Sequence, residues 1–251
     1  MSPIAISFLT LAIVFGGALF GIFLRTSLPE NHITSDSQDI VKLGMGLVGT
    51  MAALVLGLLI ASAKSSFDMQ SAELTEMSSK LVLLDRVLAH YGPAAQESRD
   101  LVRAAVVRTL DGMELQARTR DSHSDPMSAG SEALYDKVQA LVPANDAQRT
   151  MQGQALGLVI ALGQMRWLIY EQRASSVSMP LLVVLISWLT IIFVSFGLFA
   201  PFNATVLTSL FVSALSFSGA IFLILEMYTP YSGLIQLSNA PLRAALAHLG
   251  R

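Results

Sequence analysis

Cysteine is absent from this chain, and charged residues are scarce. None of the 251 residues is cysteine and 14% are charged, whereas a soluble domain is usually about 25% charged. The absence of cysteine excludes disulfides, thiolate metal sites and catalysis by a thiol. The formal net charge of −2 gives no reason to expect nucleic acid as a partner. Scarce charge together with a hydrophobic content of 53% indicates a membrane protein.

Four apolar runs are each long enough to cross a bilayer, which requires about 20 residues. They cover residues 4–24, 43–63, 181–200 and 205–225, and none has a charge in its interior. Only "PFN" and a few neighbours separate the last two runs, so we expect a tight hairpin there. The first run has no Lys or Arg before it and no Ala-x-Ala site after it, which favours a retained span over a cleaved signal peptide.

Basic residues orient the four spans. The segment between spans two and three holds twelve of the sixteen Lys and Arg residues, and the loop between spans three and four holds none. Cytoplasmic loops carry an excess of Lys and Arg near the span ends. We therefore expect both termini and the central segment to be cytoplasmic, with the spans in the cell inner membrane.

The central segment carries two rows of apolar residues at the three-and-four spacing of helices that pack lengthwise. The first row is Leu74, Met77, Leu81, Leu84, Leu88 and Tyr91, and it stops at Gly92 and Pro93. The second row is Met151, Ala155, Leu158, Leu162, Met165 and Ile169, preceded by Asn145 or Asp146 as a helix N-cap. Between them we expect a helix over 97–120, a polar loop over 121–130 and a short helix over 132–142.

The predicted fold class is all-α: an integral membrane protein with four transmembrane helices (2+2) and a helical cytoplasmic domain between spans two and three. The first transmembrane hairpin is expected over residues 1–63. The cytoplasmic domain, with the two apolar rows packed as an antiparallel coiled-coil-like pair, is expected over 64–179. The second transmembrane hairpin and a short C-terminal tail are expected over 180–251.

Two stretches resemble a bacterial family of uncharacterised four-span membrane proteins, described as bestrophin-like. They are "KLGMGLVGTMAALVLGLLIASAKSSFDMQSAELTEMSSKLVLLDRVLAHYGP", residues 42–93, and "LEMYTPYSGLIQLSNAPLR", residues 225–243. The family has no established activity to carry over residue by residue. Its wider similarity to bestrophins, which are pentameric anion channels with a large helical cytoplasmic part, implies a homo-oligomer in the lipid bilayer that acts on small anions.

Span two supplies the candidate functional residues. Its small residues allow close approach of helix backbones, so this face is interpreted either as a packing face or as a packing face beside a pore. The pore-lining or packing candidates are Leu47, Thr50, Leu54, Gly57, Leu58 and Lys64. Lys64 and Glu226 fall at the cytoplasmic ends of spans two and four, and they form a possible inter-span ion pair.

No arrangement of residues points to an enzyme, a metal site or a cofactor. The four histidines lack metal-ligand spacing, and no serine has the context of a catalytic triad. The leading hypothesis is an oligomeric membrane protein, a bestrophin-like anion channel with span two lining the pore. The alternative is a non-conducting scaffold or sensor whose cytoplasmic helices bind a partner. A third hypothesis is a subunit of a motor stator, which requires a partner with a membrane carboxylate.

Overall fold

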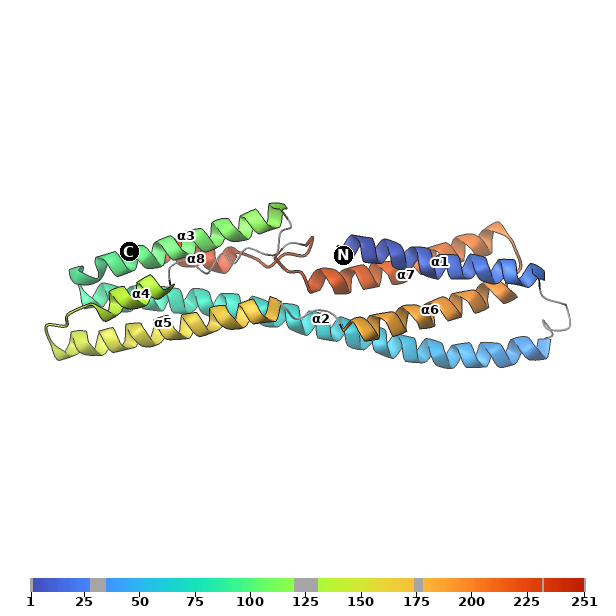
Figure 1. Cartoon of the computed structure of the whole chain (residues 1–251), viewed down its shortest axis with the longest axis horizontal. Coiled ribbons are helices and arrows are strands. Elements are labelled where there is room, and N and C mark those ends of the chain that lie inside the picture. Colours follow the sequence, from blue (N-terminus) through green and yellow to red (C-terminus); the bar gives the residue numbers. More distant parts are fainter. Residues whose placement is uncertain (1, 28–34, 120–130, 174–177, 232, 251) are drawn as a thin grey trace. The chain divides into compact units, whose positions relative to one another are not determined.

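The computed structural model describes residues 2–27, 35–119, 131–173, 178–231 and 233–250, and the predicted polar loop over 121–130 lies outside them. All regular elements in these ranges are helices (Figure 1). They are α1 (Pro3–Ser27), α2 (Ser35–Tyr91), the short 3₁₀ helix η2 (Pro93–Ala95), α3 (Gln96–Thr119), α4 (Ser131–Gln139), α5 (Asp146–Arg173), α6 (Met179–Phe199), α7 (Ala204–Met227) and α8 (Ala240–His248).

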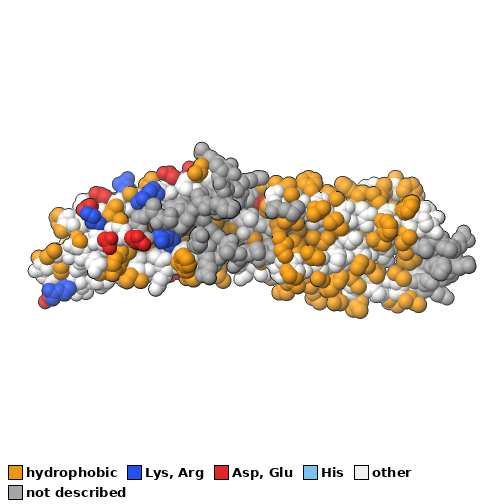
Figure 2. All heavy atoms as spheres, viewed as in Figure 1, with side chains coloured by type: hydrophobic (Ala, Val, Ile, Leu, Met, Phe, Trp, Pro, Cys, Tyr) orange, Lys and Arg blue, Asp and Glu red, His pale blue; other side chains and the backbone are white. Residues whose placement is uncertain are grey.

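Two compact units make up the chain. Unit 1 comprises residues 1–65 and 176–228, and unit 2 comprises residues 66–175 and 229–251. Hydrophobic side chains cover much of the visible surface of unit 1, whereas acidic and basic side chains gather on unit 2 (Figure 2). Four helices are long and apolar enough to cross a membrane, namely α1, α6, α7 and the first part of α2. This agrees with the four predicted apolar spans.

Helix α2 runs without interruption for 57 residues. It continues through Lys64, where the sequence turns polar, and ends at Tyr91. Gly92 follows with a φ of 113°, a conformation that favours glycine, and Pro93 cannot continue the helix. The prediction that the apolar span extends directly into a polar helix is therefore confirmed.

The core of unit 1 depends on a close crossing of α1 and α6. A Cβ added at Gly21 would overlap the carbonyl oxygen of Val194, and one added at Gly197 would overlap the carbonyl oxygen of Ala18. Glycine at both positions therefore lets the two backbones touch. Helix α7 packs on α1 as well.

Two specific contacts join α7 to α1. The rings of Phe15 and Phe211 lie edge to face with their centroids 5.3 Å apart. The buried hydroxyl of Ser218 donates a hydrogen bond of 2.6 Å to the carbonyl oxygen of Ser7. A hydroxyl that is satisfied within the protein avoids the cost of an unpaired polar group in an apolar environment.

Unit 2 has its own hydrophobic core. All six residues of the first apolar row are buried in it, and the second row contributes both buried and half-buried members. The side chain of Gln148, near the start of α5, donates a hydrogen bond of 2.9 Å to the carbonyl oxygen of Tyr91 at the end of α2. Asn145 accepts a hydrogen bond of 2.8 Å from the N–H of Gln148, so Asn145 rather than Asp146 caps α5.

Helix α4 is shorter than predicted. It ends at Gln139 instead of continuing to Val142. The side-chain amide of Gln152, on α5, donates hydrogen bonds of 3.0 Å to the carbonyl oxygen of Val138 and 2.8 Å to that of Leu141. These carbonyls are satisfied without a further helical turn, which is why the chain can leave the helix here.

The C-terminal residues form a helix that the sequence analysis did not predict. Helix α8 packs on α3, and residues 229–251 belong to unit 2. From the sequence, only a short C-terminal tail is expected after the second transmembrane hairpin within residues 180–251. Leu242 and Leu249 are buried in the core of unit 2, so apolar burial draws this segment to the helices of the central part.

Candidate functional face of α2

The predicted pore-lining residues lie on one face of the apolar part of α2. At about 100° per residue, Leu47, Leu54 and Leu58 fall within a narrow sector of the helix. Their side chains are 65%, 75% and 61% exposed. Thr50 and Gly57 are exposed beside them, and the Thr50 hydroxyl donates to the carbonyl oxygen of Leu47 at 2.7 Å.

The opposite face of the same helix is the one that packs within unit 1. Ala52, Leu59 and Ala63 are buried in its core, about half a helical turn away from the exposed leucines. In the apolar stretch of α2 only 11% of residues are buried, against 33% in α1, 39% in α6 and 28% in α7. A single chain thus covers α2 far less than the other three helices.

The glycines on the exposed side of α2 meet no close neighbour in the described residues. A Cβ added at Gly46 or Gly57 would find no atom within 4 Å. In contrast, where α1 and α6 cross, backbone atoms of the facing helix occupy the space beside Gly21 and Gly197. Among the described residues, the surface of α2 around Gly46 and Gly57 is therefore uncovered, and both interpretations of this face stay predictions.

The end of the apolar part of α2 lies close to the end of α7 at the boundary of unit 1. The hydroxyls of Ser62 and Tyr228 lie 3.1 Å apart, within hydrogen-bonding distance. Lys64 is two residues from Ser62, and Glu226 is two residues from Tyr228. This contact brings together the parts of α2 and α7 that carry Lys64 and Glu226. Their ion pair stays a prediction.

Glu226 is more buried than its position at the end of a span suggests. Only 3% of it is exposed, whereas Lys64 is exposed. Burying a carboxylate away from water is costly unless it has hydrogen bonds or an opposite charge. Sequence position alone favours solvation at the membrane edge, because it does not reveal that the last turn of α7 packs against the core of unit 1.

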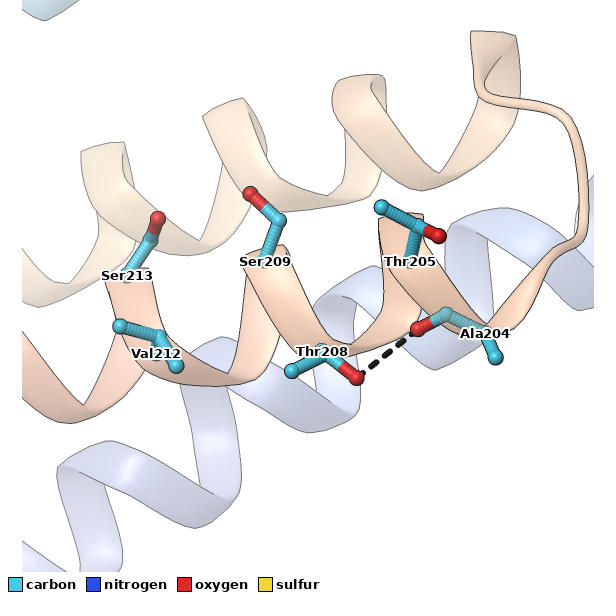
Figure 3. A pocket seen from close by; sticks show the side chains of 6 residues that line it. All are labelled: Ala204, Thr205, Thr208, Ser209, Val212 and Ser213. Atoms are coloured by element: carbon cyan, nitrogen blue, oxygen red, sulfur yellow. Dashed lines mark hydrogen bonds between the residues drawn. The ribbon is translucent and has the colours of Figure 1, made fainter.

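A shallow groove on α7 is the second open surface of unit 1. It is lined by Ala204, Thr205, Thr208, Ser209, Val212 and Ser213. Figure 3 shows Thr205, Ser209 and Ser213 projecting from one side of the helix, while the Thr208 hydroxyl donates to the carbonyl oxygen of Ala204 at 2.8 Å. Hydroxyl side chains of this kind can bond across to another membrane helix.

Comparisons with known proteins place the chain in a family. The bestrophin-like domain model matches residues 12–242. The crystal structure of a bacterial bestrophin homologue from Klebsiella pneumoniae, which carries a point mutation, is 14% identical, covers 96% of this chain and 97% of its own, and gives a TM-score of 0.69. At that identity the likeness shows a shared fold. No curated protein matches. Because the family model spans most of the sequence, the chain belongs to the bestrophin-like domain family.

Proposed function

We propose that this protein is an oligomeric membrane channel for small anions, in which the exposed face of α2 lines a pore on the symmetry axis. One observation carries the proposal: α2 is apolar enough to span a membrane, yet only 11% of its apolar stretch is buried in the single chain. A ring of copies would enclose this face. Bestrophin homologues are oligomeric membrane proteins and anion channels, which supports the same reading.

The residues of the face suggest how such a pore works. Leu47, Leu54 and Leu58 would repeat in each copy and form apolar rings, and a narrow apolar ring can gate by losing its water. Lys64 stands exposed where α2 turns polar, so it would form a ring of positive charge at the cytoplasmic mouth. Positive charge at a mouth raises the local concentration of anions.

The proposal includes a topology. The four spans form two hairpins in the cell inner membrane, and both termini and the helices of unit 2 lie in the cytoplasm. The distribution of Lys and Arg supports this orientation, since the segment between spans two and three holds most of them. Within unit 2, the proposal pairs the second half of α2 with α5, antiparallel to each other.

Cysteine labelling in intact cells tests the orientation. The chain has no cysteine, so Asp39→Cys and Asp146→Cys each introduce one thiol, at positions whose side chains are 75% and 98% exposed. We expect a membrane-impermeant maleimide to label Asp39→Cys in intact cells and Asp146→Cys only after lysis. Labelling of Asp146→Cys alone in intact cells would reverse the orientation.

Current through planar bilayers tests the channel. Purified oligomers are expected to conduct, with a reversal potential in a KCl gradient that lies toward the chloride equilibrium potential. Lys64→Glu should reduce the preference for anions, because it replaces a ring of positive charge with a ring of negative charge. Arg149→Glu, at an exposed position of α5, makes the same change of charge outside the apolar part of α2 and should leave selectivity as it is.

The outcome of that measurement separates the two main hypotheses. Silent bilayers from preparations with an intact oligomer would contradict the channel and favour the non-conducting scaffold or sensor. A current whose selectivity is equal in Lys64→Glu and in the unchanged protein would remove Lys64 from the pore mouth. Neither the channel nor the scaffold requires a chemical reaction at the protein, so the proposal includes no enzymatic activity.

A further inference from the structure

The C-terminal segment, residues 240–250, docks on unit 2 along its whole length. Helix α8 packs on α3. Its Leu242, and Leu249 just beyond it, are buried in the same core as Val102 and Val106 of α3, and its Ala245 is buried as well. The chain that leads into α8, residues 229–239, contains no regular helix in its described part. The segment is thus a short helix held by its own contacts at the end of an irregular connection.

A buried carboxylate anchors the end of this segment. Asp85, on α2, is only 1% exposed. Its Oδ1 accepts a hydrogen bond of 2.8 Å from Nε of Arg99 on α3, and its Oδ2 accepts one of 3.1 Å from Nη2 of the same side chain. Oδ2 also accepts a hydrogen bond of 3.2 Å from the backbone N–H of Gly250. The last turn of the chain therefore completes the hydrogen bonding of a buried ion pair.

The geometry of this anchor depends on glycine. Gly250 has a φ of 85°, which lies in the left-handed region where side chains with a Cβ are strained. Glycine therefore adopts this conformation without strain beside the hydrogen bond to Asp85. Hydrogen bonding to Asp85 raises the pKa of Arg99 above its ordinary value, so the guanidinium stays charged at every physiological pH.

A second ion pair joins the segment to α3, and it contributes less to docking than the buried anchor does. Arg243 and Glu114 are 2.7 Å apart, but their side chains are 60% and 44% exposed. Solvent screens an exposed pair of this kind, and it contributes little to stability. A hydrogen bond to a buried carboxylate is charge-assisted and is lost at a larger cost, because water does not readily replace it.

We propose that residues 240–250 form a strap that opens as one piece, held shut at its end by the hydrogen bond from Gly250 to Asp85. An isolated helix of nine residues is marginal in water, so α8 does not persist as a half-docked element once its end is released. The Asp85–Arg99 pair still joins α2 to α3 when the strap is open. Opening therefore uncovers the apolar side of α3 without unpacking unit 2, as in local unfolding of a native protein.

Thiol labelling of the purified full-length protein measures this opening. Leu249→Cys places a buried reporter in the strap, and Ala155→Cys places a buried reporter in the core on α5. Gly250→Pro removes the backbone N–H that donates the hydrogen bond to Asp85. We expect it to raise the labelling rate of Leu249→Cys at least about tenfold, which corresponds to about 1.4 kcal/mol. The rate at Ala155→Cys should change by less than about twofold, a shift of under about 0.5 kcal/mol.

Arg243→Gln is the matched control, because it removes the exposed pair and keeps the buried anchor. It should raise labelling of Leu249→Cys by less than about fivefold, the range expected of exposed ion pairs. Hydrogen exchange in Gly250→Pro without a reporter cysteine gives a second measurement: amides of α8 should exchange faster while those of α3 do not. Equal acceleration at Leu249→Cys and Ala155→Cys, or no acceleration at Leu249→Cys, would overturn the strap. Neither outcome depends on whether the protein conducts ions.

Discussion

Gly21→Ala is expected to destabilise unit 1 by about 3 kcal/mol or more, the upper end of what overpacking costs in a filled core. The added methyl group would overlap the carbonyl carbon and oxygen of Val194 and approach the backbone nitrogen of Leu198. These are backbone atoms of a helix, so they cannot rotate aside as a side chain would. Relief requires α1 and α6 to separate, which also removes the contacts of Ala18 and Phe193 in the shared core.

Gly16→Ala is the matched control for this prediction. Gly16 lies on the same helix, and a Cβ added there meets no atom within 4 Å. The same change should therefore be neutral in thermal unfolding of the detergent-solubilised protein. Gly197→Ala should match Gly21→Ala, because its methyl group would meet the backbone of Ala18 from the other side of the crossing. If Gly21→Ala and Gly16→Ala unfold at the same temperature, α1 and α6 do not cross closely.

Leu84→Ala is expected to destabilise unit 2 by about 2–5 kcal/mol, because it leaves a cavity in a filled core. Leu84 is fully buried, and it belongs to the cluster that Leu158, Leu162 and Met165 of α5 also contact. The surrounding helices are tied by the Asp85–Arg99 pair one residue away, so they cannot easily close the cavity.

Leu83→Ala removes the same atoms from the adjacent position and serves as the control. Leu83 is 52% exposed, while Leu84 is 0% exposed. A substitution at an exposed position of this kind should change the free energy of unfolding by no more than about 0.5 kcal/mol. Urea unfolding of both variants, followed by a signal from unit 2, gives the comparison. Small and equal changes would contradict burial of the apolar row of α2.

Hydropathy and periodicity were enough to predict the long helices of this protein, but not α8. Four uninterrupted apolar runs predict four helices that can cross a membrane, because no other backbone arrangement of that length satisfies its own polar groups in lipid. The spacing of Leu74, Leu81 and Leu88 predicts the buried side of α2, since residues at that interval fall on one face of a helix. Gly92 and Pro93 mark its end by their own backbone preferences.

The close contact between membrane helices was not predicted, although a signal for it is present. Gly17 and Gly21 stand four residues apart in the first span, which is the spacing of a helix-crossing motif. The second span is also rich in small residues, and local sequence does not distinguish a small face that is filled from one that is open. The structure fills the face of α1 and leaves that of α2 uncovered.

The hydrogen bond from Gly250 to Asp85 could not be predicted from local sequence. Asp85 and Arg99 lie on two different helices, and Gly250 lies 165 residues beyond Asp85. Nothing in the residues around Asp85 distinguishes a buried carboxylate from a solvated one on a polar helix. By itself the sequence determined the class of the protein, its apolar spans and the buried sides of its helices, because these follow from local hydropathy and period. The tertiary structure decided which small faces are filled, how deeply Glu226 and Asp85 are buried, and where the C-terminus docks, because each of these depends on groups that meet only when distant helices pack.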